Sequence, residues 1–205
     1  MSAQVFKFEK YRKPLSWLYA FFVGLLILFS GSKWEDSYLI YATIIFAVGC
    51  ILIGVASMGR LWCTLYISGY KNTVLIKVGP YSLCRNPLYF FSLLGATGVG
   101  FATETLTIGA IIATGIVLYY PFVIKNEESR LLSLHGEEFE RYKKTTPAFF
   151  PKFSNLQEPE EYVVKPRLFK KMMFNVLWFV WLAGILEIIE ALHETNILPI
   201  LIKLY

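Results

Sequence analysis

Side chains capable of chemistry gather in a short polar segment, residues 78–89, which reads VGPYSLCRNPLY and separates long apolar runs. A glycine and a proline at positions 79 and 80 interrupt any helix there, and a proline at position 87 can begin the next one. Between these breaks stand Tyr81, Arg85 and Asn86, a cation and two hydrogen-bonding side chains. Polar groups held beside membrane-like apolar runs are unfavourable unless they bind something, so we interpret this segment as part of a binding site.

Two adjacent carboxylates form a second polar feature. Glu127 and Glu128 follow the next pair of apolar runs along the chain. Arg85 offers a planar fork for a carboxylate or a phosphate, whereas two glutamates suit an ammonium, a pair of ribose hydroxyls or a sulfonium. A zwitterionic cofactor with a ribose and a positive centre would use both, and S-adenosylmethionine has those features. NADPH would require more positive charge around its phosphates.

The composition indicates a membrane protein. Of 205 residues, 56% are hydrophobic and 17% aromatic, whereas soluble domains are about 45–50% apolar. Because the excess lies in separate blocks, the sequence predicts one all-α domain, a polytopic membrane helical bundle with about five transmembrane helices and a cytosolic amphipathic helix. The formal net charge is +5, and the lysines and arginines cluster in a few loops. This pattern is typical of membrane topology and not of a nucleic-acid partner. Three cysteines without metal-ligand spacing favour free thiols.

The apolar blocks set the expected spans. A membrane helix needs about 20 residues, and a helix in the second block can extend to Ser68 before Gly69 ends it. Three glycines in the third block, at positions 95, 98 and 100, favour close helix packing over a nucleotide loop, because no strand precedes them. The expected spans are residues 14–30, 37–57, 87–101, 105–124 and 174–189.

The third and fourth spans should form a tight hairpin. Only a very short turn at Glu104 joins them, so their other ends must lie near one another. Those ends carry Arg85 and Asn86 on one side and Glu127 and Glu128 on the other. This return of the chain is the strongest geometric expectation that the sequence provides.

An amphipathic helix is expected next, over residues 126–144. Its leucines and aromatic residues fall near one face and its charges on others, and Gly136 suggests a break or kink. Such a helix would lie along the membrane surface or cap the site. Residues 154–167 are expected to be a loop, and the tail after residue 190 is too short to cross again.

Charge sets the expected orientation. The basic N-terminus, the loop 70–86 and the segment 125–171 should be cytosolic, whereas the turns near Lys33 and Glu104 and the C-terminal tail should face the other side. The N-terminal region lacks a clear cleavage site, so an uncleaved first span is expected rather than a signal peptide. We therefore expect an integral membrane protein of a bacterial inner membrane or its equivalent, surrounded by membrane lipids, with its active site facing the cytosol.

Taken together, these motifs resemble the isoprenylcysteine carboxyl methyltransferase family and the wider group of membrane methyltransferases that includes phospholipid N-methyltransferases. The resemblance covers about residues 75–152, the expected catalytic core, with spans 14–68 before it and an extra span within 174–192 after it. It rests on order and spacing, in Gly79-Pro80-Tyr81, Arg85-Asn86-Pro87-Leu88-Tyr89, Glu127-Glu128, Gly136-Glu137-Glu138-Phe139-Glu140-Arg141-Tyr142 and the prolines at 147 and 151.

The resemblance implies methyl transfer from S-adenosylmethionine to a lipid-like acceptor, either a prenylcysteine-type carboxylate or a phospholipid amine. Arg85 could orient a carboxylate, and Glu128 could take the proton of an amine. Where the carboxyl methyltransferases usually read Arg-His-Pro, this chain has Asn86, which resembles the phospholipid enzymes and puts a prenylcysteine substrate in doubt. The residues that would line the cofactor are Gly79, Tyr81, Arg85, Asn86, Tyr89, Glu127 and Glu128.

Two other functions remain open from the sequence. One is a sterol-reductase-like NADPH enzyme, which would need more spans and more basic residues, and the other is a non-catalytic membrane module. Glu187, Glu190 and His193 share a helical face, but a second carboxylate–histidine pair is lacking, so they favour a helix exit or a polar interhelical contact and no metal ligand is predicted. The oligomeric state is not indicated by the sequence.

Overall fold

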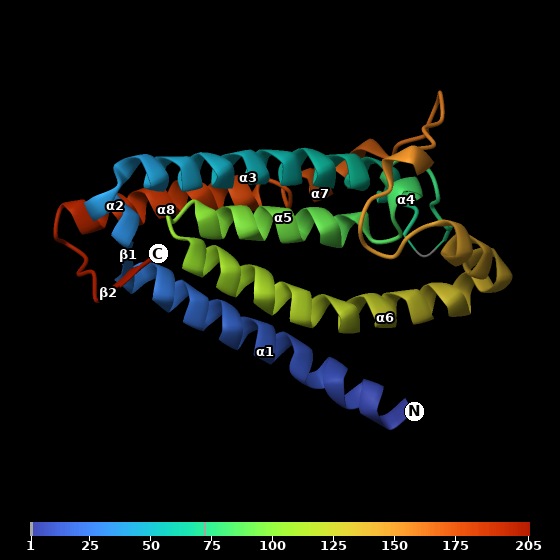
Figure 1. Cartoon of the computed structure of the whole chain (residues 1–205). Coiled ribbons are helices and arrows are strands. Elements are labelled where there is room, and N and C mark those ends of the chain that lie inside the picture. Colours follow the sequence, from blue (N-terminus) through green and yellow to red (C-terminus); the bar gives the residue numbers. More distant parts are fainter. Residues whose placement is uncertain (1, 72) are drawn as a thin grey trace.

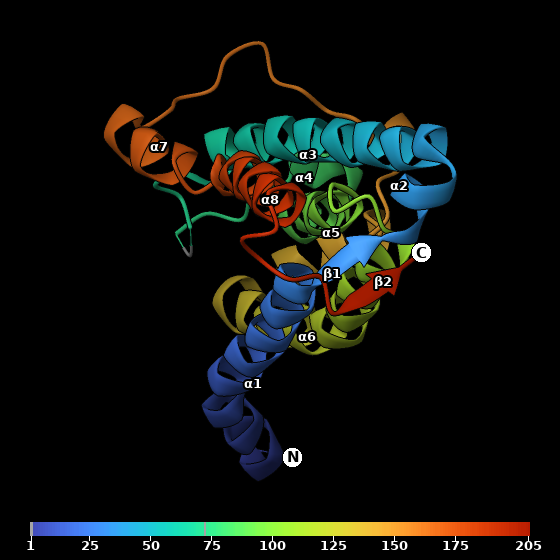
Figure 2. The same ribbon diagram turned by 90° about the vertical axis from the view of Figure 1, so that its left-hand side faces the viewer.

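A computed structural model gives the fold and describes residues 2–71 and 73–205, with side chains described from Pro14 onward except at positions 36, 37 and 72. The long helices run roughly along one axis, and α5 lies between α3, α6 and α8 (Figures 1 and 2). The long helices are α1 (Ser2–Phe29), α3 (Leu39–Ile67), α5 (Pro87–Phe101), α6 (Leu106–Thr145) and α8 (Trp178–Glu194). The short elements are β1 (Ser30–Ser32), α2 (Lys33–Ser37), α4 (Pro80–Leu83), η1 (Phe153–Asn155), α7 (Pro166–Met173) and β2 (Ile202–Leu204).

The apolar helices confirm the expected all-α membrane bundle. Within the described residues, three helical stretches are long and apolar enough to cross a membrane, Leu39–Ile67, Leu106–Thr145 and Pro166–Glu194. Two shorter apolar helices, Pro14–Phe29 and Pro87–Phe101, coincide with the first and third expected spans. Large apolar side chains such as those of Trp17, Ile51 and Leu118 point outward, as they should where lipid replaces water.

Close backbone contact joins α3 to α5. A Cβ added to Gly98 would lie 2.8 Å from the carbonyl oxygen of Gly49, and one added to Gly49 would lie 2.7 Å from the Gly98 carbonyl oxygen. Small residues allow such an approach between membrane helices, so the packing interpretation of the third-span glycines is confirmed. Beside this crossing, Ile53, Val99 and Leu186 form a buried cluster that includes α8.

The fourth span and the amphipathic segment form one long helix with a break. Residues 126–144 are helical, as expected, and the break falls at Gly136, whose φ of 49° and ψ of −124° are not helical. The difference from expectation is that residues 126–135 simply continue the fourth span, because Gly136 is the first residue there that interrupts a helix. Only the last turns fold back, and they pack Phe139 and Tyr142 against Leu75.

The C-terminal tail closes the opposite end of the bundle. No strand was expected from the sequence, but Ser30–Ser32 and Ile202–Leu204 pair as two short parallel strands. Figure 2 shows these strands side by side, and the Thr107 amide donates to the Tyr205 carbonyl 2.7 Å away. The turn at Glu104 lies here too, since the Ser32 hydroxyl donates to its carbonyl at 2.9 Å. The loops expected on one side of the membrane therefore do share one end of the molecule.

Candidate active site

The polar loop before α5 is folded around Gly79. This residue has a φ of 60°, which only glycine adopts readily, and it precedes the one-turn helix α4. Its carbonyl accepts a 2.6 Å hydrogen bond from the Ser82 hydroxyl, and its amide donates to the Gln157 carbonyl at 2.8 Å. A Cβ at this position would lie 2.5 Å from the ring of Tyr66. Gly79 therefore fixes the direction in which α4 leaves the loop.

Arg85 joins this loop to α6. Its Nε donates to Glu128 Oε1 at 2.8 Å, and the two side chains are only 9% and 16% exposed. One terminal nitrogen, Nη1, donates to the carbonyls of Lys143 and Thr146 at 3.1 and 2.5 Å. The guanidinium thus ties together the loop, the middle of α6 and the end of α6. The hairpin expectation is confirmed, because the two hairpin ends lie in direct contact.

Asn86 supports the same junction from the start of α5. Its Nδ2 donates to the Ala148 carbonyl at 2.9 Å and lies 3.4 Å from Glu128 Oε1. The residue is buried, with 6% of its surface exposed. An amide at this position can therefore donate to a carboxylate and a carbonyl at once, which is what the observed geometry requires.

Tyr81 lies beneath the folded-back end of α6. The Tyr142 hydroxyl donates to the Tyr81 carbonyl at 2.5 Å, which holds α4 under the last turns of α6. Among the described residues, the Tyr81 hydroxyl has no hydrogen-bond partner although it is buried. Burial raises the pKa of Tyr81 well above its usual value, so the phenol stays neutral and can donate a hydrogen bond to a ligand.

A cavity of about 300 Å³ opens beside this junction. Five of the seven residues expected to line a cofactor are in its wall: Tyr81, Arg85, Asn86, Tyr89 and Glu127. The remaining two, Gly79 and Glu128, lie outside the wall. Gly79 shapes the loop, and the Glu128 carboxylate is turned toward Arg85 and Asn86.

The cavity also has walls that the sequence did not point to. Arg60 and Thr64 come from α3, and Met172 and Asn175 come from α7 and its connection to α8. Arg60 is the lone charged residue of α3. Its position inside an apolar helix was a usable signal. No comparable signal marks Met172 or Asn175, because their place depends on how the fifth span packs.

An apolar groove of about 560 Å³ lies between α1 and α6. Its wall includes Leu15, Tyr19, Tyr120 and Phe122. The ring of Tyr120 touches that of Tyr89, with centroids 5.1 Å apart, and Tyr89 lines the polar cavity. The groove and the cavity therefore adjoin across a pair of aromatic rings.

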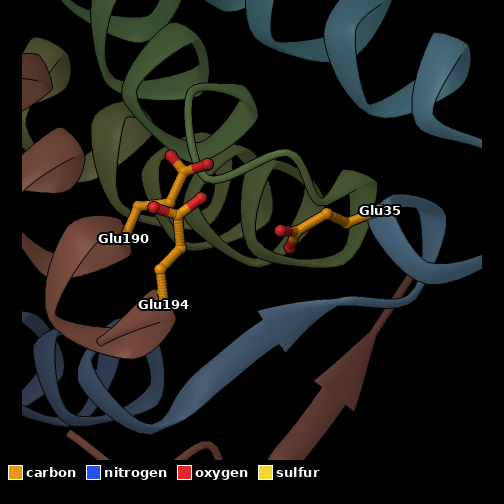
Figure 3. A group of neighbouring side chains, drawn as sticks. All are labelled: Glu35, Glu190 and Glu194. Atoms are coloured by element: carbon orange, nitrogen blue, oxygen red, sulfur yellow. The ribbon is translucent and has the colours of Figure 1, made fainter. Parts of the chain in front are cut away.

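A second polar cavity, of about 150 Å³, lies at the β1–β2 end. Potential ligand oxygens of Glu35, Glu190 and Glu194 lie within 4.8 Å of one another there. Figure 3 shows the two carboxylates of α8 next to each other and Glu35 extending from α2 toward them. Of the residues that the sequence singled out here, Glu190 belongs to this acidic cluster, whereas His193 Nε2 lies 3.0 Å from the Leu28 carbonyl.

The helices define an integral membrane protein, and the polar cavity is a candidate ligand site at one end of its helical hairpin. The chain belongs to the phospholipid methyltransferase family, whose model matches residues 36–138. That match ends inside the folded-back part of α6 and includes every residue expected to line the cofactor.

Two bacterial relatives cover most of the chain. The nickel-cobalt-cadmium resistance protein NccN of Alcaligenes xylosoxydans xylosoxydans is 38% identical over 92% of this chain and 87% of its own length. The cobalt-zinc-cadmium resistance protein CzcN of Cupriavidus metallidurans is 37% identical over 89% of this chain and 83% of its own length. No solved structure matches the chain.

Proposed function

We propose that this protein transfers a methyl group from S-adenosylmethionine to a lipid-like acceptor at the cytosolic face of the membrane. The observation that carries the proposal is the junction of Arg85, Asn86 and Glu128, which closes the hairpin beside a cavity lined by Tyr81 and Glu127. Membership of a methyltransferase family supports it.

The cavity wall has the donors and acceptors that such a cofactor needs. The Glu127 carboxylate can accept hydrogen bonds from ribose hydroxyls or from the cofactor's ammonium group, and the unpartnered Tyr81 hydroxyl can donate one. The aromatic faces of Tyr81 and Tyr89 suit a sulfonium or an adenine ring. The volume is at the small end of the range usual for ligand pockets, about 300–1,000 Å³.

In this proposal Arg85 and Glu128 do not have the roles expected from the sequence, in which Arg85 orients a carboxylate and Glu128 takes the proton of an amine. Arg85 is occupied by a carboxylate and two carbonyls, so its part is to hold the loop against α6. Glu128 is the counterion that keeps Arg85 in place. Glu127, which lies on the wall, is therefore the better candidate to accept a proton from an amine acceptor, with Glu128 behind it.

When bound, the cofactor would supply an electrophilic methyl group on a sulfonium. A lone pair of the acceptor forms the new bond to that carbon while the carbon–sulfur bond breaks and its electrons stay on sulfur. The chain's contribution is to position the two reactants in line and to exclude water, through the cap of Phe139 and Tyr142 over the loop. An apolar tail of the acceptor would lie in the groove between α1 and α6, beside Tyr120.

Cofactor binding tests the proposal and separates it from its alternatives. Detergent-solubilised protein should bind radiolabelled S-adenosylmethionine in preference to NADPH. Glu127→Gln should weaken that binding by about tenfold or more, because a hydrogen bond to a charged group is lost. Glu137→Gln, at an exposed position of the same helix, is the matched control. Preference for NADPH would favour a reductase, and binding of neither would favour a non-catalytic module.

The acceptor is best identified by product analysis. Membranes and small metabolites are incubated with the protein and methyl-labelled cofactor, and labelled products are located by mass spectrometry. A labelled amphiphile is the expected result. A water-soluble small molecule as the preferred acceptor would contradict a lipid-like substrate.

A second candidate function is binding of a divalent cation at the Glu35, Glu190 and Glu194 cluster. The names of both relatives refer to resistance to divalent metals. The cavity at the cluster also contains Ser30, which is 7% exposed and whose hydroxyl has no partner among the described residues. Side chains two apart on a strand share a face, so Ser30 points the same way as Ser32, whose hydroxyl bonds to the cavity-lining Glu104.

The electrostatics of this cluster also favour a cation. Burial, followed by the nearby carboxylates of Glu35 and Glu187, raises the pKa of Glu104 in the same cavity. Oxygen ligands of this kind suit hard or borderline divalent ions. Calorimetry with Co²⁺, Zn²⁺ and Mg²⁺ should show binding that Glu190→Gln removes and Glu187→Gln leaves intact. Equal binding by wild type and Glu190→Gln would rule out this site.

A further inference from the structure

Arg60 is an arginine placed inside a membrane helix. It lies seven residues before the end of α3, and α3 contains no other charged residue. Ionisable side chains at such positions face the interior of a bundle and generally mark a functional pathway or pair with another group. Arg60 faces the interior, because it lines the same cavity as Tyr81 and Asn86.

The residues with described side chains provide no counterion for the charge of Arg60. Its Nη1 donates to the Ser92 hydroxyl, which in turn donates to the Leu88 carbonyl at 2.6 Å. Its Cζ lies 5.6 Å from the centre of the Phe179 ring. Among the residues that the structure describes, its buried Nε has no hydrogen-bond partner and none of the ion pairs involves Arg60.

Arg85 provides the contrast within the same cavity. Both arginines are in the wall, but Arg85 is neutralised by Glu128 and bonded to two carbonyls. Glu127, the carboxylate in the wall, is on α6 and is not within ion-pair distance of Arg60. Lys71 is also in the wall, but it is exposed to solvent, so an anion entering the cavity would meet its less exposed free donor at Arg60 and not at Arg85.

We propose that Arg60 binds an anionic group of the methyl acceptor, a carboxylate or a phosphate. This inference rests on the proposed methyltransferase function and specifies its substrate class as an anionic amphiphile. The planar guanidinium suits both oxyanions, and a buried site strengthens such a charge-assisted hydrogen bond. Ser92 holds Nη1 from one side, whereas the buried Nε has no hydrogen-bond partner among the described residues.

The position of Arg60 fits the groove for the apolar tail. Arg60 bonds to Ser92 on α5, one turn beyond Tyr89, and Tyr89 contacts Tyr120 in the wall of the groove between α1 and α6. A tail in that groove would place its charged end near Arg60.

If the bound carboxylate is itself the methyl acceptor, esterification removes its negative charge, and the neutral product is bound less tightly. A phosphate beside an accepting amine keeps its charge.

Direct binding measurements test this assignment independently of turnover. The protein is reconstituted in neutral phosphatidylcholine nanodiscs and titrated with fluorescent N-palmitoylglycine, with its uncharged glycinamide counterpart, and with a lysophosphatidic acid probe. The wild-type protein should prefer the two anions. Arg60→Gln should weaken anion binding by about 10- to 100-fold, which is the range expected for a lost hydrogen bond between charged groups. Arg130→Gln, an exposed arginine on α6, is the matched control.

Two further measurements separate the possible failures. Arg60→Lys keeps the charge and should retain part of the anion binding, and thermal unfolding of each variant reports whether it is folded. The affinities of wild type and Arg60→Gln for S-adenosylmethionine are measured in parallel. Equal anion binding by these two proteins, or equal affinity of the wild type for acid and amide, would overturn the role of Arg60. Failure of the wild type to bind S-adenosylmethionine would instead overturn the proposed function. Preference between the carboxylate and phosphate probes distinguishes the two acceptor types.

Discussion

At the scale of single residues, two ion pairs connect the loop before α5 to α6, and they differ in burial. Arg85–Glu128 has side chains 9% and 16% exposed, whereas Lys77–Glu138 has side chains 44% and 45% exposed. Water screens the second pair and compensates either partner when the other is removed. The first pair has little access to water, so loss of one partner leaves a buried charge unsatisfied.

We therefore expect Glu128→Gln to destabilise the protein by about 1–3 kcal/mol and to weaken cofactor binding. Lys77→Gln, which breaks the exposed pair, should cost less than about 0.5 kcal/mol. Thermal unfolding in one detergent, with and without S-adenosylmethionine, measures both effects. If the two substitutions proved equally mild, Arg85–Glu128 would not be what holds the loop.

Gly79 gives a second residue-scale prediction. Alanine there would combine an unfavourable φ of 60° with a Cβ 2.5 Å from the Tyr66 ring, a strain of about 1–3 kcal/mol. Gly79→Ala should therefore lower the unfolding temperature and the affinity for S-adenosylmethionine. In Gly54→Ala a Cβ would meet nothing within 4 Å, so that variant should be neutral or stabilised by up to about 1 kcal/mol. Similar behaviour of the two variants would contradict this view of the loop.

The sequence could predict the residues of the junction but not all those of the cavity. Arg85, Asn86, Glu127 and Glu128 are brought together by a hairpin with a very short turn, and that constraint is local. Which of the two glutamates faces the cavity depends on the rotation of α6 about its axis, which one sequence does not reveal. Asn175 reaches the wall through packing of α7 and α8 against α3, a long-range arrangement without a motif.

At the scale of elements, the break in α6 at Gly136 allows the last turns of the helix to fold back over the site. Gly136 has dihedral angles that a residue with a side chain adopts only under strain, although a Cβ there would meet nothing within 4 Å. The strain of an added side chain is therefore purely conformational. It can be relieved by straightening the helix, which would carry Phe139 and Tyr142 away from Leu75 and Tyr81.

Gly136→Ala should consequently open the cap and leave the bundle folded. We expect faster hydrogen exchange in residues 137–146, unchanged exchange in the first half of α6, and weaker binding of S-adenosylmethionine. Gly184→Ala, in the middle of α8 with nothing within 4 Å of the added Cβ, is the control and should alter neither measurement. Full cofactor affinity in Gly136→Ala would show that the folded-back end is dispensable for binding.

Elements with strong local signals were predictable, and those made by distant partners were not. The observed α5 has the bounds expected for the third span, because Pro87 favours a helix start and the apolar block ends at the turn. The strands β1 and β2 have three residues each and are paired across almost the whole chain. Segments this short have no periodicity to detect, so the sequence did not predict these strands.

At the scale of the whole molecule, the two ends of the bundle differ in charge. The Glu104 end has the carboxylates of Glu35, Glu190 and Glu194 and, among the residues with described side chains, Lys33 and Lys203 as its lysines. The α4 end is rich in exposed lysines and arginines. They include Lys71, Lys77, Arg141, Lys143, Lys144, Lys152, Lys165, Arg167, Lys170 and Lys171. Since basic loops are retained in the cytosol, this asymmetry predicts a cytosolic α4 end.

Cysteine labelling in oriented membranes can test that orientation. In a protein with the exposed Cys50 replaced by serine, Cys63 and Cys84 remain buried and should not react. Ser154→Cys at the α4 end should react with a membrane-impermeant maleimide in inverted vesicles but not in intact cells stripped of their outer membrane. Thr195→Cys at the other end should show the reverse. The reverse pattern for both would put the cavity on the side where S-adenosylmethionine is not made, and methyl transfer from that cofactor would then lose its supply.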